Sequence, residues 1–245
     1  MLFLQETHFT DSSLPKLPTH LFPQWYLSDS PRAKSRGVAI AIHRHCQFQP
    51  TDHKVDPQGR YVFLKGTIMG QKFTFATVYA PNSQQLTFID QTLAQLADFR
   101  EGRLILGGDF NISPDPLLDT STNKTTHSNA FLRHFRRTLQ GHTLVDCWRA
   151  LHATERDYSY FSSVHKVYTR IDMLLVDQDA LDLLLGATID QITISDHAPV
   201  TLTISLSQAL SRVRTWKLNE DLLDDLGVAA GVGDIDALFS GKRLR

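Results

Sequence analysis

Cysteine is scarce in this sequence, with only Cys46 and Cys147 among its 245 residues. The two are far apart and form no Cys-x-x-Cys motif, so the sequence predicts neither a disulfide framework nor a cysteine zinc site, and it favours a reducing compartment. Long apolar runs are also missing, which argues against a membrane-spanning helix, and we expect no membrane partner.

Excess charge is missing as well, because the formal net charge at pH 7 is −1. Global electrostatics therefore do not indicate a nucleic-acid-binding protein. A polyanionic substrate would need a local basic patch or bound cations. The richest local patch is the helical stretch Arg133 to Arg137, which we interpret as a solvated helix face and as the best candidate for contact with a phosphate backbone.

Apolar periodicity predicts strands and helices that mix without strict alternation. The expected strands cover residues 1–4, 37–43, 60–68, 72–79, 104–106, 157–162, 171–176, 188–194 and 200–206, and the expected helices cover 86–99, 130–139, 144–151 and 178–185. Several neighbouring strands look antiparallel. The pattern predicts an α/β fold in which two mixed β-sheets pack face to face with helices outside, a four-layer α/β sandwich.

This domain is expected to cover residues 1–206. For residues 207–245 we expect a helical linker, with a helix over about 218–226, followed by a flexible tail.

The stretch from Leu104 to Asn111, reading LILGGDFN, carries the first chemical signal. Three apolar residues predict a short buried strand, and the two glycines predict a tight turn. Asp109 and Asn111 are two apart, so on an extended backbone they would point to the same side. A carboxylate and an amide at the end of an apolar strand are a candidate site for a hard cation and a phosphate.

Similar groups follow other predicted strands. Strand ends in an α/β core can converge on one cleft, where carboxylate and amide oxygens suit Mg²⁺ and a histidine titrates near neutrality. Together such groups polarise a phosphoryl oxygen and offset developing charge. The candidate groups are Glu6, Tyr79, Asp109, Asn111, Asp172, Asp196 and His197.

Most of these residues also have a plain structural interpretation. Glu6 fits a solvated strand end, Tyr79 a core aromatic, and Asp196 and His197 an ordinary turn. Asp172 fits such an interpretation less well, because a carboxylate inside an apolar run is costly unless it is paired.

A second group of metal-ligating residue types, His43, His45 and Cys46, follows another strand. We interpret it as a solvated strand end, because no fourth ligand follows at a zinc-finger spacing.

Five motifs in order resemble the endonuclease/exonuclease/phosphatase superfamily: LQETH at 4–8, VYAPN at 78–82, LGGDFN at 106–111, TRIDMLLV at 169–176 and SDHAPV at 195–200. Within it the chain looks most like the abasic-site-endonuclease-type domain of non-LTR (LINE) retrotransposons. Residues 157–172 are similar to the strand–loop–strand that precedes an Asp of that family. Residues 216–219 resemble a segment that leads to a reverse transcriptase. The resemblance covers about residues 1–206.

The resemblance implies Mg²⁺-dependent hydrolysis of DNA phosphodiester bonds, with Mn²⁺ as a substitute ion. It implies a DNA substrate, a nuclear location inferred from that substrate, and a reverse transcriptase domain in the parent element. The implied metal-binding residues are Glu6, Asp109, Asn111, Asp196 and His197, and the implied catalytic residues are Tyr79, Asp109, Asn111, Asp172 and His197.

The implied roles differ from residue to residue. Asp109 would orient or deprotonate the attacking water, Asn111 would help to hold the phosphate, and Tyr79 would lie near the scissile phosphate. Asp172 would orient His197. The residues themselves agree with that last role, because an acidic partner fixes the tautomer of a histidine and raises its pKa.

The chain departs from the family pattern at its start. Family members begin with another strand that carries an Asn and a helix, whereas this chain starts inside the following strand, so we expect the first strand to be missing. Two alternatives to an active DNA endonuclease stay open, the first because of this departure and the second because the same fold serves other phosphodiesterases. One is a catalytically dead retroelement remnant. The other is a phosphodiesterase or phosphatase of the same superfamily that acts on a non-DNA phosphate ester, such as a phosphoinositide or sphingomyelin.

Overall fold

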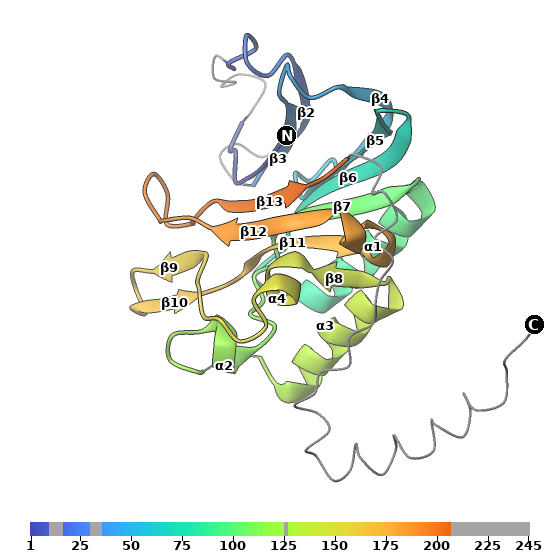
Figure 1. The fold of residues 1–245 in the computed structure, drawn as a ribbon. Helices are drawn as coiled ribbons and strands as arrows, with labels where there is room; N and C mark the ends of the chain where they lie inside the picture. Colours follow the sequence, from blue (N-terminus) through green and yellow to red (C-terminus); the bar gives the residue numbers. More distant parts are fainter. Residues whose placement is uncertain (10–16, 30–35, 125–126, 207–245) are drawn as a thin grey trace, which may run out of the picture. The chain divides into compact units, whose positions relative to one another are not determined.

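A six-stranded mixed sheet forms the middle of the fold (Figure 1). The computed structural model describes residues 1–9, 17–29, 36–124 and 127–206. The strands are β1 (Leu2–Gln5), β2 (Gln24–Ser28), β3 (Val38–Ile42), β4 (Phe48–Val55), β5 (Tyr61–Ile68), β6 (Gln71–Tyr79), β7 (Arg103–Asp109), β8 (Leu144–Asp146), β9 (Tyr160–Ser162), β10 (Val167–Thr169), β11 (Asp172–Asp177), β12 (Leu184–Ile189) and β13 (Val200–Ile204). The helices are α1 (Gln85–Phe99), α2 (Pro116–Asp119), α3 (Asn129–Gly141), α4 (Cys147–Leu151) and the 3₁₀ helix η1 (Gln178–Leu183).

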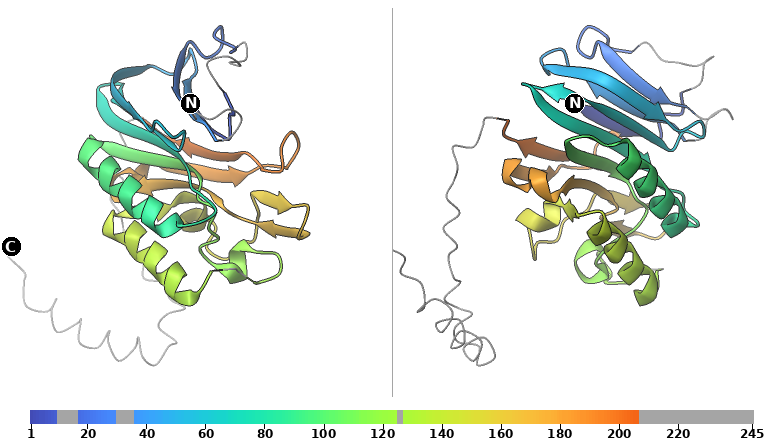
Figure 2. Two further views of the ribbon diagram at one scale, coloured as in Figure 1. Left: turned by 180° about the vertical axis from the view of Figure 1, so that it is seen from behind. Right: turned by 90° about the vertical axis from the view of Figure 1, so that its right-hand side faces the viewer.

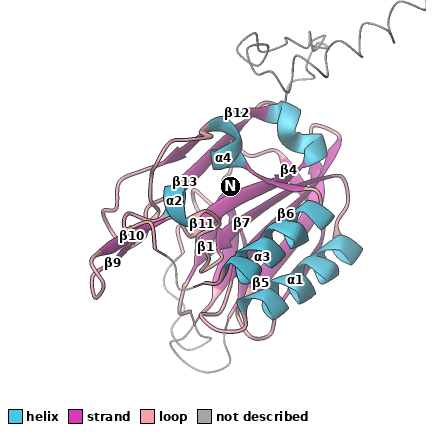
Figure 3. Ribbon diagram, turned by 90° about the horizontal axis from the view of Figure 1, so that it is seen from below, coloured by secondary structure: helices cyan, strands magenta, loops and turns pink. Residues whose placement is uncertain are grey.

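The central sheet has the strand order β4-β5-β6-β7-β11-β8, with β6 and β7 parallel and the other neighbours antiparallel. The helices α1 and α3 lie side by side on one face of this sheet (Figure 3). Each turns an apolar stripe toward it, as the spacing of Leu132, Phe135 and Leu139 in α3 illustrates. The Ser128 hydroxyl caps α3 by accepting a hydrogen bond from the Phe131 amide at 3.2 Å.

The opposite face of the central sheet is covered by a second layer of strands, seen from three directions in Figures 1 and 2. One part of that layer has the order β1-β3-β2 and the other is the pair β12-β13. Strand β1 packs on β6 and β7, while β13 packs on β11. The predicted α/β sandwich with two packed sheet layers and helices outside is therefore confirmed. Both long helices of the described ranges lie on the outer face of the six-stranded sheet.

The strand β7 is buried on both of its faces. Leu104 and Leu106 belong to the core under the helices, and Ile105 belongs to the core between the sheet layers. This double burial explains why the strand reads as an uninterrupted apolar run rather than as an alternating one.

The two glycines after that run do not form the predicted turn, because β7 continues through them to Asp109. A β-carbon on Gly107 would collide with the side chains of Phe3 and Leu174. A β-carbon on Gly108, whose φ is +146°, would overlap the carbonyl of Val78 on the neighbouring strand. The glycines are therefore required by close packing between strands and layers.

Other predicted elements also shift. Strands β2, β4 and β10 and the short helix α2 lie outside the elements that the sequence predicts. The predicted helix 144–151 divides into β8 and α4, because β8 pairs with β11. The predicted strand 188–194 is replaced by β12, which begins at Leu184 and pairs with β13. The division of residues 144–151 and the position of β12 were decided by pairing with another strand, which the pattern of a single segment does not contain.

The described chain forms one unit, Met1–Leu206. The linker, helix and tail predicted for residues 207–245 lie outside the described residues. Among the described residues no helix is both long and apolar enough to cross a bilayer.

Replacing Gly108 by Ala should lower the free energy of unfolding by at least about 3 kcal/mol, because the substitution combines a backbone conformation that suits glycine with an overlap at the Val78 carbonyl. Urea denaturation followed by circular dichroism measures the change. Gly141→Ala is the matched control, since a β-carbon there meets nothing within 4 Å, and it should cost nothing or stabilise slightly. Equal stability of the Gly108 variant and the wild type would contradict this account of β7.

Candidate active site

Strand register brings three of the predicted site residues into one row. Tyr79, the last residue of β6, pairs with Asp109, the last residue of β7. Asp109 in turn pairs with Asp172, the first residue of β11. Neighbouring strands lie about 4.8 Å apart. The three residues therefore lie next to one another where β6 and β7 end and β11 begins, although Tyr79 and Asp172 are 93 positions apart in the sequence.

His197 joins this row from the loop between β12 and β13. Its Nδ1 lies 2.8 Å from Oδ2 of Asp172. Burial alone would lower the pKa of His197, but the hydrogen bond and charge of Asp172, together with the charge of Asp109, raise that pKa to about 9. The imidazole is therefore held in the protonated form at neutral pH, with Nδ1–H donated to the carboxylate.

Asp109 is almost completely buried and is held by Asn111. The backbone N–H of Asn111 donates to Oδ1 of Asp109 at 2.8 Å, and the side-chain Nδ2 of Asn111 donates to Oδ2 of Asp109 at 3.3 Å. Nδ2 also donates to the carbonyl of Ala80 at 2.9 Å. The two side chains do meet, but by a turn in which Asn111 has a φ of +52° rather than by the extended backbone that the spacing suggested.

The surroundings of Asp109 fit a divalent cation. Burial, followed by the charge of Asp172, raises the pKa of Asp109 to about 7. Carboxylate oxygens of Asp109 and Asp172 and a ring nitrogen of His197 all lie within 4.8 Å of one another, and of these the two carboxylates are the groups that can ligate an ion while His197 is protonated. Two carboxylates this close and this poorly solvated lack sufficient positive charge, and oxygen donors of this kind suit a hard ion such as Mg²⁺.

The structure places Glu6 and Asp196 beside this cluster rather than within it. The Glu6 carboxylate, at the end of β1, forms a hydrogen bond with the Tyr79 hydroxyl, and burial together with Glu6 raises the pKa of that hydroxyl. The charge of Glu6 also acts on Asp109, and the charge of Asp196 acts on His197. All the predicted acidic groups thus belong to one electrostatic neighbourhood.

Ser159 is a buried site residue that the sequence did not single out. Its Oγ accepts hydrogen bonds from the amides of Ile171 at 3.1 Å and Asp172 at 3.0 Å. Its own carbonyl accepts from the amide of Ala198 at 2.7 Å. Ser159 therefore joins the backbone of Asp172 to the residue that follows His197, and so helps to set their separation.

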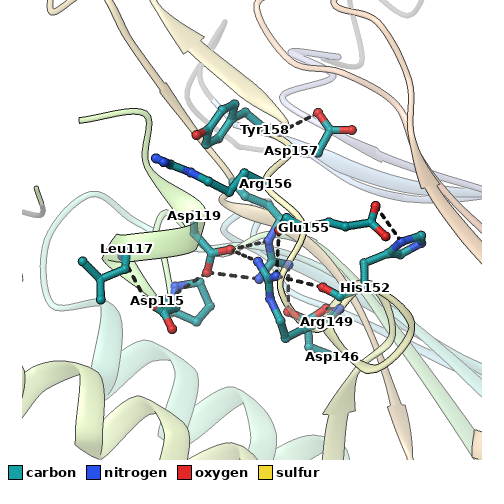
Figure 4. Close-up of polar contacts among 12 residues, drawn as sticks. Asp115, Leu117, Asp119, Asp146, Arg149, His152, Glu155, Arg156, Asp157 and Tyr158 are labelled. Carbon is teal, nitrogen blue, oxygen red and sulfur yellow. Dashed lines mark hydrogen bonds and ion pairs between the residues drawn. The ribbon is translucent and has the colours of Figure 1, made fainter. Parts of the chain in front are cut away.

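A buried ion network supports the same edge, and Figure 4 shows part of it. The fully buried Arg170 guanidinium donates to both oxygens of Asp119, at 2.8 and 3.1 Å, and to Asp146 at 2.7 Å. Arg149 donates to Asp119 at 2.7 Å. The network ties the loop that follows Asn111 to the start of β11. In the sequence, the only hint of this network is Arg170, a charged residue two positions before Asp172.

Arg60, which is not part of this network, flanks Tyr79. Its guanidinium carbon lies 5.0 Å from the centre of the Tyr79 ring, and Nη1 donates to the Tyr79 carbonyl at 3.2 Å. Arg60 therefore brings positive charge beside Glu6 and Tyr79.

The predicted basic face lies on α3. Arg133 and Arg137 are exposed and line an open depression of about 550 Å³, while His134 of the same face pairs with Asp90 of α1 at 2.9 Å. The histidines of the other predicted cluster, His43 and His45, contact each other edge to face at 4.9 Å.

The family model for the endonuclease/exonuclease/phosphatase family matches residues 1–197. The chain belongs to this family. Its motifs therefore carry the family relationship that the sequence indicated.

Among curated proteins, a Xenopus laevis protein, the transposon TX1 uncharacterized 149 kDa protein, is 27% identical over 240 residues. The match covers 95% of this chain and 18% of that protein, so the chain spans less than a fifth of the relative's length. This likeness agrees with the retroelement branch that the motifs indicated.

Solved structures of DNA-processing enzymes share the fold. The 3′-5′ exonuclease NExo of Neisseria meningitidis is 26% identical, with a TM-score of 0.62 and coverage of 83% of this chain and 88% of that chain. The catalytic domain of Xenopus laevis APE2 is 20% identical, with a TM-score of 0.67 and coverage of 82% of each chain. An AP endonuclease from Archaeoglobus fulgidus is 19% identical, with a TM-score of 0.66 and coverage of 83% and 88%.

Replacing Ser159 by Ala should lower the free energy of unfolding by about 2 to 4 kcal/mol, because the buried amides of Ile171 and Asp172 would both lose an acceptor. Urea denaturation gives the value. The control is Ser162→Ala at the end of β9, three residues after Ser159. The Ser162 hydroxyl accepts from the more exposed His165 amide, and its loss should cost less than about 1 kcal/mol. Equal costs for the two variants would remove the special position given to Ser159.

Proposed function

We propose that this protein hydrolyses phosphodiester bonds of DNA with the help of a divalent cation, and that it acts as an endonuclease that nicks duplex DNA. The observation that carries the proposal is the row of Tyr79, Asp109 and Asp172 with His197 hydrogen-bonded to its end. The Neisseria protein NExo, which is 26% identical to this chain, supports the proposal. One structure of NExo, described as a 3′ phosphatase, contains a product DNA hairpin.

The protonated His197 is the proposed group that neutralises the phosphate. Asp172 accepts its Nδ1–H, which leaves Nε2–H as the donor toward a phosphoryl oxygen. Ser159 and the Arg170 network keep Asp172 from moving away. This arrangement provides a fixed positive charge opposite a developing negative one, without reorganisation during the reaction.

Asp109 is the proposed residue that orients the attacking water and accepts its proton. Asn111 holds both carboxylate oxygens of Asp109 and thereby limits its rotation. Tyr79 contributes its hydroxyl beside the scissile phosphate, in a position set by Glu6 and Arg60. These roles are the ones that the family resemblance implies, and the positions of the groups and general acid–base chemistry support them.

The proposed cation is Mg²⁺, with Mn²⁺ as a substitute. Asp109 and Asp172 would hold it, with Glu6, Asn111, Asp196 and His197 around them. When bound, it would polarise a phosphoryl oxygen and offset the charge of the two buried carboxylates. A nuclear location and a reverse transcriptase elsewhere in the parent element stay predictions that follow from the DNA substrate and the retroelement likeness.

Purified protein with Mg²⁺ should convert supercoiled plasmid to the nicked circular form. The double variant Asp109→Ala, His197→Ala should be slower by at least about 100-fold, because general acid–base groups commonly contribute factors of about 10² to 10⁴. Agarose electrophoresis measures the conversion. Asp52→Asn, which changes an exposed carboxylate on β4 outside the predicted site and the predicted basic face, is the control for general handling.

Wild-type nicking no faster than that of the double variant would reject the proposal. A catalytically dead remnant would give this result with every substrate. Release of phosphate from a 3′-phosphorylated oligonucleotide, without plasmid nicking, would favour activity at DNA ends. Release from inositol phosphates alone would favour the non-DNA alternative.

Mg²⁺ should raise the melting temperature of the wild type. A ligand at ten times its dissociation constant stabilises the folded state by about 1.4 kcal/mol, or about 3–5 °C for a domain of this size. Differential scanning fluorimetry measures the shift, and EDTA should reverse it and stop nicking. Asp109→Asn should show little or no shift, whereas Asp52→Asn, an exposed carboxylate on β4, should behave like the wild type. Equal shifts in melting temperature in all three proteins would show that the cation does not bind at Asp109.

A further inference from the structure

The loop between β12 and β13 exposes a large apolar side chain next to the candidate active site. Ile194 is 97% exposed, more than any other large apolar residue of the described ranges. Single exposed apolar residues are common and need no explanation by themselves. The position of Ile194 gives it significance, because it precedes His197 by three residues.

This loop is braced rather than loose. The Asp190 amide donates to the Pro199 carbonyl at 2.9 Å and closes its base. The Asp196 carbonyl accepts from the Phe161 amide at 3.0 Å, and the His197 amide donates to the Ser195 hydroxyl at 3.1 Å. Ile194 therefore lies between two hydrogen-bonded ends of one loop, which lowers the entropy that a contact would cost.

The hairpin β9–β10 projects on the same side of the molecule, as Figures 1 and 2 both show. Its turn carries Val164, which is 82% exposed, and Lys166, whose Nζ lies 6.0 Å from the Phe161 ring. Tyr168 lies against Phe161 with 4.5 Å between ring centres. Exposed apolar groups and aromatic rings beside a positive charge suit nucleobases joined by phosphates.

Distance limits what Ile194 can reach. Three residues span at most about 10 Å, which corresponds to about three base-pair steps of about 3.4 Å. A duplex whose scissile phosphate lies at His197 therefore places neighbouring bases within reach of the loop. Proteins that insert isoleucine or similar side chains between base steps unstack those bases locally.

We propose that Ile194 is an apolar wedge that contacts and partly unstacks the bases beside the scissile phosphate of duplex DNA. This proposal rests on the proposed DNA substrate. It assigns the loop between β12 and β13 a part in recognising deformable base steps, separate from the chemistry at Asp172 and His197. The proposed partner of the exposed Ile194 side chain is a nucleobase, whose flat apolar face the side chain would contact.

The test uses the full chain and a set of duplexes that carry 2-aminopurine at successive positions, with EDTA present so that binding is measured without cleavage. Wild-type protein should raise the 2-aminopurine fluorescence at one or two adjacent positions. Ile194→Ala should lose most of that rise and bind about 5- to 20-fold more weakly, in line with the loss of a buried isoleucine contact. Ile194→Leu should retain the rise.

The matched control is Met69→Ala, which truncates a 67% exposed apolar side chain in the turn between β5 and β6 and should change neither signal. In plasmid nicking, Ile194→Ala should raise KM and leave kcat close to the wild-type value. Its melting temperature should stay unchanged, because the side chain contacts little in the folded protein.

The outcomes separate this proposal from the proposed function. Wild-type protein that nicks DNA, together with an Ile194→Ala variant of unchanged affinity and fluorescence, overturns the wedge and leaves the nuclease. Binding with a fluorescence rise but without nicking rejects the nuclease and supports the wedge. A change in oligomeric state on gel filtration, with unchanged DNA binding, assigns Ile194 to a protein contact and also overturns the wedge.

Discussion

The antiparallel register between β7 and β11 is the constraint on which the candidate site depends. It places Asp109 opposite Asp172 at the edge of the central sheet, and the parallel pairing of β6 with β7 adds Tyr79 to the same row. A slip of one residue would turn a side chain to the opposite face of its sheet. Because the two faces of β7 pack against different layers, such a slip would exchange fitted contacts for poorly fitting ones and would move Gly107 and Gly108 away from the neighbours that leave no room for a side chain, so the core protects the register.

The strands around β7 approach so closely that two positions have no room for a β-carbon, and both positions are glycine. Gly108 sits against the Val78 carbonyl, and Gly107 leaves room for Phe3 from the second layer. Without those glycines, β6 and β7 could not carry Tyr79 and Asp109 side by side. Three consecutive residues of β7 thus combine two roles: Gly107 and Gly108 permit the close packing, and Asp109 is the central residue of the row.

Charge is arranged in two separate groups around this row. In one, Arg170 is fully buried and matched by Asp119 and Asp146, so its burial is compensated and its part is structural. In the other, Asp109 and Asp172 are close together and are countered only in part by His197. The Arg170 network is fully compensated and supports the fold, whereas the pair Asp109 and Asp172 is only partly neutralised and is the part of the row that we propose binds a cation.

The sequence by itself determined the α/β sandwich, the family and the identity of the groups at the row, because apolar periodicity and five ordered motifs are local properties of the chain. It indicated that Asp172 needed a partner, since a carboxylate in an apolar run is costly alone, and His197 is that partner. Only the tertiary structure decided that β2 and β4 are strands, that Ser159 joins Asp172 to the His197 loop, and that Arg170 belongs to a buried network. Each of these depends on hydrogen bonds or ion pairs with another segment of the chain, and the residue pattern of one segment does not record which partner it meets.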